Sequence, residues 1–267
     1  MTTAPAPEPA RERRLVFGEN AELYDRARPA YPAALVDDLV TLVGPHARAL
    51  DVGCGTAKAT RLLAERGVTG VALEAHPAMA AVARRHLAAW PGWRVDVGGF
   101  EAWEPQDGDA PFDLITCAQA WHWLDPEVRI RKAHDLLRPG GWLAVFWNVQ
   151  DPDQPAADLV RALEDIYDRH VPGEGLMPVP SEVDPAGAET IPPDRGFDPP
   201  LTRDYRWTCS YTTAGWLDLM RTHSRNMLLE PDARERLLAE IGAAIDAHGG
   251  AFEYAYLAQL GAARRSR

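Results

Sequence analysis

Short hydrophobic runs alternate with helical patterns along residues 31–148. The segment 31–44 carries apolar residues at helical spacing, with a proline near its start and a glycine at its end. Because the hydrophobic runs are rich in β-branched residues and lack a polar face, they predict a parallel sheet covered by helices on both sides. The predicted strands are 47–52, 68–74, 93–97, 112–118 and 142–148, and the predicted helices between them are 57–66, 76–90 and 126–137.

The pattern changes after residue 148. A helix is predicted over 156–170, but eight prolines interrupt 171–200, so most of that stretch is expected to be a loop excursion. Further on, the pattern predicts strands at 201–212 and 252–263 and helices at 214–229 and 232–250. We therefore expect an α/β fold with a doubly wound, seven-stranded, mostly parallel sheet. Its expected divisions are a disordered tail at 1–14, a single domain at 15–267, a loop and helix excursion at 149–200, and helices at 213–246 that cover the substrate site.

Composition narrows the function. No apolar run reaches the roughly 20 residues of a membrane helix, and no apolar stretch follows the arginines near the start, so we expect a soluble chain and no membrane partner. Cys54, Cys117 and Cys209 lack CxxC spacing, which argues against a disulfide framework or a zinc site and favours the cytoplasm. We predict no metal. The net charge of −11 disfavours nucleic acid and favours a small-molecule ligand.

Residues 50–63, LDVGCGTAKATRLL, run from a buried strand through a glycine turn into a helix. Gly53 and Gly55 allow positive φ and close approach of a ligand, and the helix start offers free N–H groups. A dinucleotide fingerprint beginning at Gly53 needs glycine at position 58, where this chain has Lys58, so that alternative is weakened but stays open. Glu74 ends the next strand, where a carboxylate can accept both hydroxyls of a ribose.

The stretch 119–124 follows a predicted strand and precedes a strong helix start at Asp125. It is therefore expected at the carboxyl edge of the sheet, where ligands of open α/β folds bind. His122, between Trp121 and Trp123, is a candidate for acid–base work or substrate positioning. Alternatively, the tryptophans only shield apolar surface, and the histidine is a hydrogen-bonded spacer.

Several segments together resemble the class I S-adenosylmethionine-dependent methyltransferases, and more narrowly the group that contains the trans-aconitate methyltransferases. They are DVGCG at 51–55, Glu74, AQAWHW at 118–123, LRPGGWLAVFWN at 137–148, FGENAELYDRARPAYP at 17–32 and TTAGWLDLMRTHS at 212–224. The resemblance covers nearly the whole chain after residue 15. It implies a Rossmann-like methyltransferase fold and S-adenosylmethionine as the cofactor.

The resemblance also implies roles for particular residues. Gly53, Cys54 and Gly55 would pass under the methionyl part of the cofactor, and Asp51 would order the loop beneath. The other implied cofactor contacts are Glu74 at the ribose, Phe100 and Glu101 beside the adenine, Gln119 after the fourth strand, and Tyr24 and Arg28 at the amino-acid end, where Arg28 could pair with a carboxylate. The family often has a third glycine where this chain has Ala57, a change expected to cost little.

The implied activity is methyl transfer to an oxygen of a small molecule, such as a carboxylate or hydroxyl. Such a transfer needs alignment and exclusion of water more than it needs a base. A peptide, protein or natural-product acceptor is an alternative, as are an NAD-type oxidoreductase and a non-catalytic cofactor-binding protein. Candidates for the substrate cavity are Trp121, Trp123, Trp216, Arg221 and His223; the last three equally suit an ordinary amphipathic cover helix. The sequence does not predict the oligomeric state.

Overall fold

The computed structural model describes residues 20–109, 111–173, 175–177 and 191–266. The predicted disordered tail at 1–14 lies outside the described residues. So do residues 174 and 178–190 of the predicted excursion.

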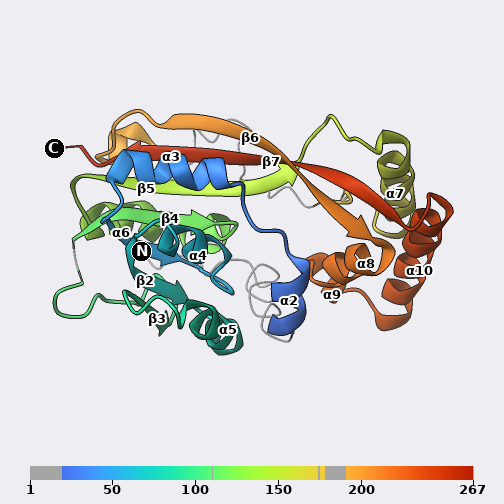
Figure 1. Cartoon of the computed structure of the whole chain (residues 1–267), viewed down its shortest axis with the longest axis horizontal. Coiled ribbons are helices and arrows are strands. Elements are labelled where there is room, and N and C mark those ends of the chain that lie inside the picture. Colours follow the sequence, from blue (N-terminus) through green and yellow to red (C-terminus); the bar gives the residue numbers. More distant parts are fainter. Residues whose placement is uncertain (1–19, 110, 174, 178–190, 267) are drawn as a thin grey trace, which may run out of the picture. The chain divides into compact units, whose positions relative to one another are not determined.

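Seven strands form one sheet in the order β3-β2-β1-β4-β5-β7-β6 (Figure 1). The pairs β1–β2, β1–β4, β2–β3 and β4–β5 are parallel. The predicted doubly wound, mostly parallel sheet is therefore confirmed, and its strand order reverses between β1 and β4. The strands are β1 Arg48–Val52, β2 Thr69–Glu74, β3 Trp93–Val97, β4 Phe112–Ala118, β5 Leu137–Gln150, β6 Leu201–Thr212 and β7 Ala251–Arg264.

The helices follow the predicted pattern with local caps. Pro32 and Gly44 bound α3, and Gly44 has the positive φ of 89° that a helix-ending glycine commonly adopts. The Asp125 side chain accepts a hydrogen bond from the backbone N–H of Glu127 and caps α6. None of the described helices is long and apolar enough to cross a membrane. The α-helices are α2 Ala21–Ala27, α3 Ala33–Val43, α4 Lys58–Ala64, α5 Pro77–Leu87, α6 Pro126–Leu136, α7 Ala157–His170, α8 Thr213–Arg221, α9 Ser224–Met227 and α10 Pro231–Ala247.

The single helix predicted at 214–229 is wrong. It is broken between α8 and α9, where His223 has an extended backbone with ψ 126°. The Thr222 hydroxyl donates to the Leu219 carbonyl at 2.7 Å, and Asn226 Nδ2 donates to the Met220 carbonyl at 2.8 Å. These side chains satisfy carbonyls that a continuing helix would have used, which explains the break.

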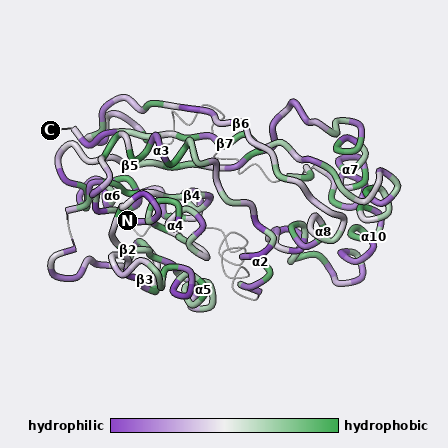
Figure 2. Tube along the Cα trace, viewed as in Figure 1, coloured by the Kyte–Doolittle hydropathy of each residue, from purple (hydrophilic) through white to green (hydrophobic). Residues whose placement is uncertain are grey.

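The described residues fall into two compact units. Unit 1 comprises those within Met1–Pro29, Val149–Val179 and Arg206–Leu257, and unit 2 comprises the rest. The prediction of a single domain stays a prediction beside this division. The core of unit 1 is a cluster of side chains from α7, α8, α10 and the strands β6 and β7, while that of unit 2 includes the buried faces of β1, β2 and β4. In Figure 2, hydrophobic residues run along β5 and β7.

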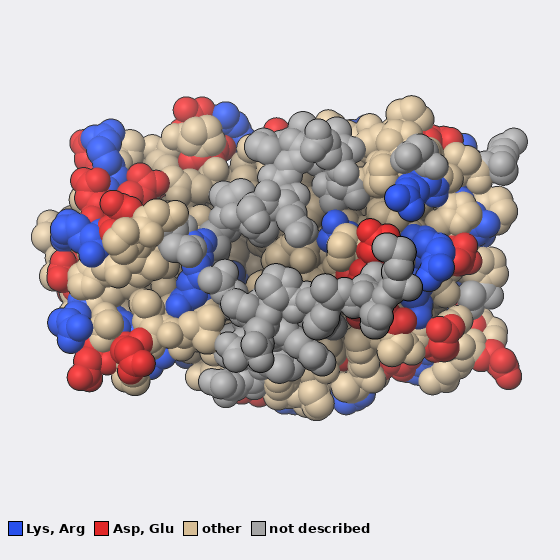
Figure 3. Space-filling view, turned by 180° about the vertical axis from the view of Figure 1, so that it is seen from behind, with Lys and Arg blue, Asp and Glu red and all other residues tan. Residues whose placement is uncertain are grey.

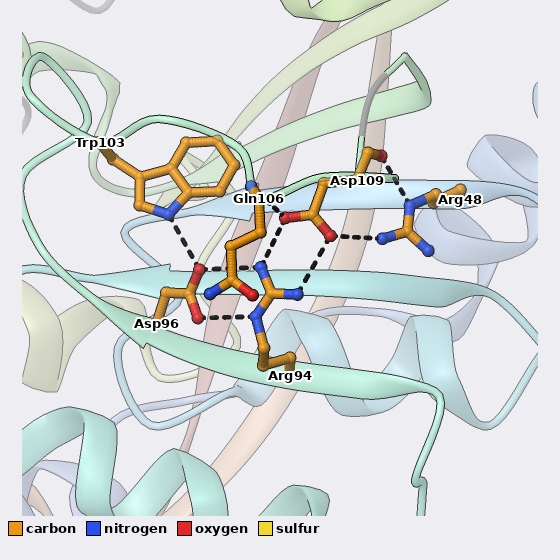
Figure 4. A network of polar contacts seen from close by, with 6 residues as sticks. All are labelled: Arg48, Arg94, Asp96, Trp103, Gln106 and Asp109. Carbon is orange, nitrogen blue, oxygen red and sulfur yellow. Dashed lines mark hydrogen bonds and ion pairs between the residues drawn. The ribbon is translucent and has the colours of Figure 1, made fainter.

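A network of ion pairs holds the loop between β3 and β4 in unit 2 (Figure 4). Arg94 donates to Asp96 at 2.8 Å and to Asp109 at 2.6 Å, and Arg48 donates to Asp109 at 2.8 Å. The Trp103 indole donates to Asp96 at 2.9 Å. Hydrogen bonds from Arg94 hold the pKa of both carboxyl groups below its usual range. The network therefore fixes the segment that carries Phe100 and Glu101.

Candidate active site

The glycine turn lies where the strand order reverses, the position at which ligands of open α/β sheets bind. Gly53 and Gly55 have φ of 66° and 60°, a region that favours glycine. A Cβ placed on Gly53 would lie 2.6 Å from the Cβ of Ala120, so the loops that follow β1 and β4 meet here. The turn therefore exposes backbone at the point that the sequence indicated, and a side chain on Gly53 would close it.

Asp51 links the strand before this turn to the neighbouring helix and strand. Its buried carboxylate accepts hydrogen bonds from Thr60 at 2.5 Å and Thr116 at 2.8 Å, which link β1 to α4 and β4. Burial raises the pKa of Asp51 to about 6 although the two hydroxyl groups oppose the shift, and the charge of Glu74 adds to it. These bonds tie the end of β1 to its neighbours, and the loop-ordering role that the resemblance implies for Asp51 stays a prediction.

Glu74, at the end of β2, joins the turn. Its carboxylate accepts from the backbone N–H of Gly55 at 2.9 Å and of His76 at 2.8 Å. Cys54 lies between the two glycines with 8% of its surface exposed, and burial raises the pKa of its thiol well above the usual value, with smaller contributions from Glu74 and Asp51. The structure thus places Glu74, the predicted contact of the ribose, against the loop that is predicted to bind the methionyl part of the cofactor.

Ala57 starts α4 in the left-handed conformation, with φ 67° and ψ 29°, and is fully buried. Ala57 occupies the position at which the family that the sequence resembles often has a third glycine. A residue with a Cβ is strained in this region, so the alanine fits the space but not the backbone preference.

The loop after β4 contains the short 3₁₀ helix η2, Trp121–Trp123. Trp121 is buried, and its carbonyl accepts from Arg129 at 2.8 Å. The His122 ring lies 4.5 Å from that of Trp123, and its buried Nδ1 has no hydrogen-bond partner among the described residues. Burial, with the charge of Arg129, lowers the pKa of His122 to about 4, so the imidazole is neutral near pH 7.

Gln119 leads into the same loop with a φ of 60°, uncommon for a residue other than glycine. Its backbone N–H donates to the Phe146 carbonyl at 2.9 Å, and its side-chain amide donates to the Asn148 carbonyl at 3.3 Å. These bonds hold the loop against the end of β5.

Phe100 and Glu101 stand on the loop between β3 and β4. Phe100 is buried, with the Lys132 ammonium 5.7 Å from its ring centroid. The Glu101 carboxylate accepts from the backbone N–H of Asp125 at 3.0 Å, which ties this loop to the start of α6. Their predicted contact with adenine stays a prediction.

The remaining predicted residues belong to unit 1. Arg28 lies over the Tyr24 ring at 5.3 Å and donates to the Thr222 carbonyl at 2.8 Å. Trp216 is fully buried among aromatic side chains of the unit 1 core, and its predicted place in the substrate cavity stays a prediction. Arg221 is within 3.6 Å of Glu235.

Sequence reasoning missed Thr60, Thr116 and Arg129. Thr116 carried a signal, because it is a lone hydroxyl in the middle of the apolar run 112–118. Arg129 gave none, since its contact with Trp121 depends on how α6 folds back over the loop.

The sheet order, the glycine turn at its reversal and the acidic residue that ends β2 define the class of α/β proteins that bind a nucleoside-containing cofactor. Three observations fit S-adenosylmethionine: Gly53 keeps the backbone open, Glu74 is near the turn, and the buried Nδ1 of His122 lacks a partner among the described residues.

Comparisons with known proteins identify the family. Residues 49–141 match the model of a methyltransferase domain. An uncharacterised methyltransferase of Mycobacterium bovis is 33% identical over 238 residues, which cover 89% of this chain and 88% of that protein. A trans-aconitate 2-methyltransferase of Delftia acidovorans is 32% identical over 53% of this chain and 50% of its own length. A solved structure from Anaeromyxobacter dehalogenans, described as a type II methyltransferase, has a TM-score of 0.63 at 26% identity, and the match covers 90% of this chain and 98% of that one.

The chain belongs to the class I S-adenosylmethionine-dependent methyltransferases. It is an enzyme with S-adenosylmethionine as its cofactor, and the NAD-dependent and non-catalytic alternatives are set aside.

Proposed function

We propose that this methyltransferase transfers a methyl group to an oxygen atom of a small-molecule acceptor, either a carboxylate or a hydroxyl. One observation carries the proposal: His122 presents a neutral imidazole, with a buried unpaired nitrogen, on the loop that meets the glycine turn. The similarity to a protein named trans-aconitate 2-methyltransferase supports a small acid as the acceptor.

S-adenosylmethionine supplies an electrophilic methyl group bound to a sulfonium. The proposed contacts of unit 2 are Gly53, Cys54 and Gly55 beneath its methionyl part, Glu74 at its ribose, Phe100 and Glu101 at its adenine, and Gln119 over it. Asp51 keeps the turn in place through Thr60 and Thr116. Tyr24 stays a predicted contact of the amino-acid end.

His122 would serve either acceptor from its neutral form. A neutral imidazole donates from one nitrogen and accepts at the other. Toward a carboxylate, which is already ionised near neutral pH, the ring would donate a hydrogen bond and align the oxygen. Toward a hydroxyl, it would accept the proton released as the new bond to carbon forms. Trp121 and Trp123 would exclude water around the reacting atoms.

Surface charge favours a small molecule over nucleic acid. The whole chain has a net charge of −11. On the face drawn in Figure 3, the described basic residues are interspersed with acidic ones and form no broad patch of one sign. Such a surface gives phosphate backbones little attraction.

The His122→Ala variant tests the role of the loop. With a panel of small carboxylates and alcohols, and S-adenosylhomocysteine release as the readout, we expect turnover to fall roughly 10²-fold or more. We expect the affinity for S-adenosylhomocysteine, measured by calorimetry, to stay within about threefold, because the proposed cofactor contacts remain.

The matched control is His46→Ala, which removes an exposed histidine. Turnover of His122→Ala equal to that of the wild type would show that the loop only shields the site. Methylation of peptides with no small molecule accepted would overturn the proposed acceptor.

A further inference from the structure

His223 is a buried histidine of unit 1 whose side chain is unsatisfied by any described residue. It stands at the break between α8 and α9, and only 1% of its surface is exposed. Neither Nδ1 nor Nε2 has a hydrogen-bond partner among the described residues. Because leaving a buried polar nitrogen unpaired costs free energy, such a ring calls for a ligand.

Arg28 is the second unsatisfied group of unit 1. Its Nη2 donates to the carbonyl of Thr222, the neighbour of His223, but its buried Nε has no partner in the described part of the chain. No carboxylate among the described residues forms an ion pair with Arg28, although many other arginines of the described chain have one. A guanidinium held in this way presents an unused N–H and an uncompensated positive charge.

A pocket opens beside these groups within unit 1. It is lined by Asn20, Leu23, Tyr24, Arg221, Thr222 and Met227. Two of these lining residues also contact Arg28: its guanidinium lies over the Tyr24 ring, and its Nη2 donates to the Thr222 carbonyl.

The electrostatics of this region favour an anion. Burial and the positive charges of Arg28 and Arg225 lower the pKa of His223 well below its usual value, so the ring is neutral and keeps one N–H to donate. The charge of Arg28 also acts on Tyr211. The amino-acid end of the cofactor carries an ammonium beside its carboxylate, and these surroundings repel an ammonium. A bare carboxylate suits them better.

We propose that His223 and Arg28 form a carboxylate-binding site in unit 1, and that its occupant is a small organic acid. The oxygens would accept from Nε of Arg28 and from one ring nitrogen of His223. This site goes beyond the proposed reaction, and it assigns Arg28 to that acid instead of the cofactor.

Binding without turnover tests the site. We would titrate succinate, and its neutral analogue succinamide, into the full-length enzyme saturated with S-adenosylhomocysteine, by calorimetry. We expect binding of succinate but not of succinamide, and a loss of about tenfold in succinate affinity for His223→Gln and for Arg28→Gln, since each removes one charge-assisted or buried hydrogen bond. Affinity for S-adenosylhomocysteine should change less than about threefold.

Two variants control for folding and charge. His248→Gln alters an exposed histidine of unit 1 and should bind succinate as the wild type does. Arg28→Lys keeps the charge but lacks Nε, so it should bind succinate more tightly than Arg28→Gln and less tightly than the wild type.

The outcomes separate this site from the proposed reaction. Variants that lose S-adenosylhomocysteine affinity while keeping succinate affinity would overturn the site, because Arg28 and His223 would then serve the cofactor. Equal binding of succinate and succinamide would overturn it too. If the succinate results hold but no oxygen acceptor is methylated, the carboxylate site stands and the proposed oxygen transfer fails.

Discussion

At Ala57 there is room for the side chain, but the backbone conformation is strained. Its methyl group is fully accommodated, yet its φ of 67° belongs to the region that only glycine adopts freely. The sequence interpretation weighed side-chain size alone and therefore expected little loss. The structure shows that the position tolerates alanine at a conformational cost.

The Ala57→Gly variant should therefore be more stable than the wild type. We expect the free energy of unfolding to rise by about 0.5–1 kcal/mol, because relief of left-handed strain exceeds the added flexibility of the unfolded chain. Urea unfolding measures the change. Ala59→Gly, the same substitution inside α4, should instead lower the free energy of unfolding. A loss of stability in both variants would contradict the strain.

At the scale of elements, the connection between β3 and β4 depends on Asp109. Its buried carboxylate accepts hydrogen bonds from the Arg48 and Arg94 guanidinium groups and from the backbone N–H of Gln106. Figure 4 shows the two guanidinium groups reaching it, Arg48 from β1 and Arg94 from β3. A loop that would otherwise be loose is thus fastened to the sheet, together with the aromatic side chains it carries.

Asp109→Asn should loosen this loop. We expect the free energy of unfolding to fall by roughly 1–3 kcal/mol near pH 7, with solvent screening of the half-exposed arginines favouring the lower end. Because the folded pKa of Asp109 is lowered, its stabilisation is present above about pH 4 and is lost as the pH falls through the folded value. The difference between variant and wild type should shrink accordingly.

Urea unfolding across the acid range checks this, with the exposed Asp107→Asn as the control. A difference that is independent of pH would show that the charge of Asp109 contributes nothing.

The sequence predicted elements well where a pattern is local. β4 and β6 begin and end at the predicted residues because apolar runs and alternation bound them sharply. β5 begins at Leu137, earlier than the predicted 142, since the register shift between Phe112 and Leu114 lets it pair across its Pro-Gly-Gly segment. The break at His223 was missed because Asn226, which satisfies the Met220 carbonyl, reaches back only once the chain has folded.

At the scale of the whole molecule, the division into two units could not be predicted from the pattern of hydrophobic and polar residues. Unit 1 gathers three separate stretches of chain, and hydrophobic periodicity does not say which distant segments share a core. The proposed cofactor loops are local to unit 2, which explains why motif and spacing found them. The unsatisfied groups of unit 1 emerged only from burial and pairing.

Cofactor binding should stabilise the whole enzyme and protect the loops of unit 2. At a concentration of S-adenosylhomocysteine 100 times its Kd, we expect about 2.7 kcal/mol of added stability. Hydrogen exchange should slow in peptides covering 51–60 and 119–124, with α10 as the internal reference because no proposed cofactor contact comes from it. NAD should cause neither effect. Protection by NAD, or protection confined to α10, would contradict the assignment.

The burial of Cys54 affects its reactivity toward the cofactor. S-adenosylmethionine is an alkylating agent, and a thiolate is among the strongest nucleophiles a protein can offer. The residue between the two glycines of the proposed binding loop is a cysteine, but burial and the neighbouring carboxylates keep its sulfur protonated. The same packing that shapes the loop therefore holds this cysteine in its thiol form, which is a weaker nucleophile toward the methyl group than a thiolate.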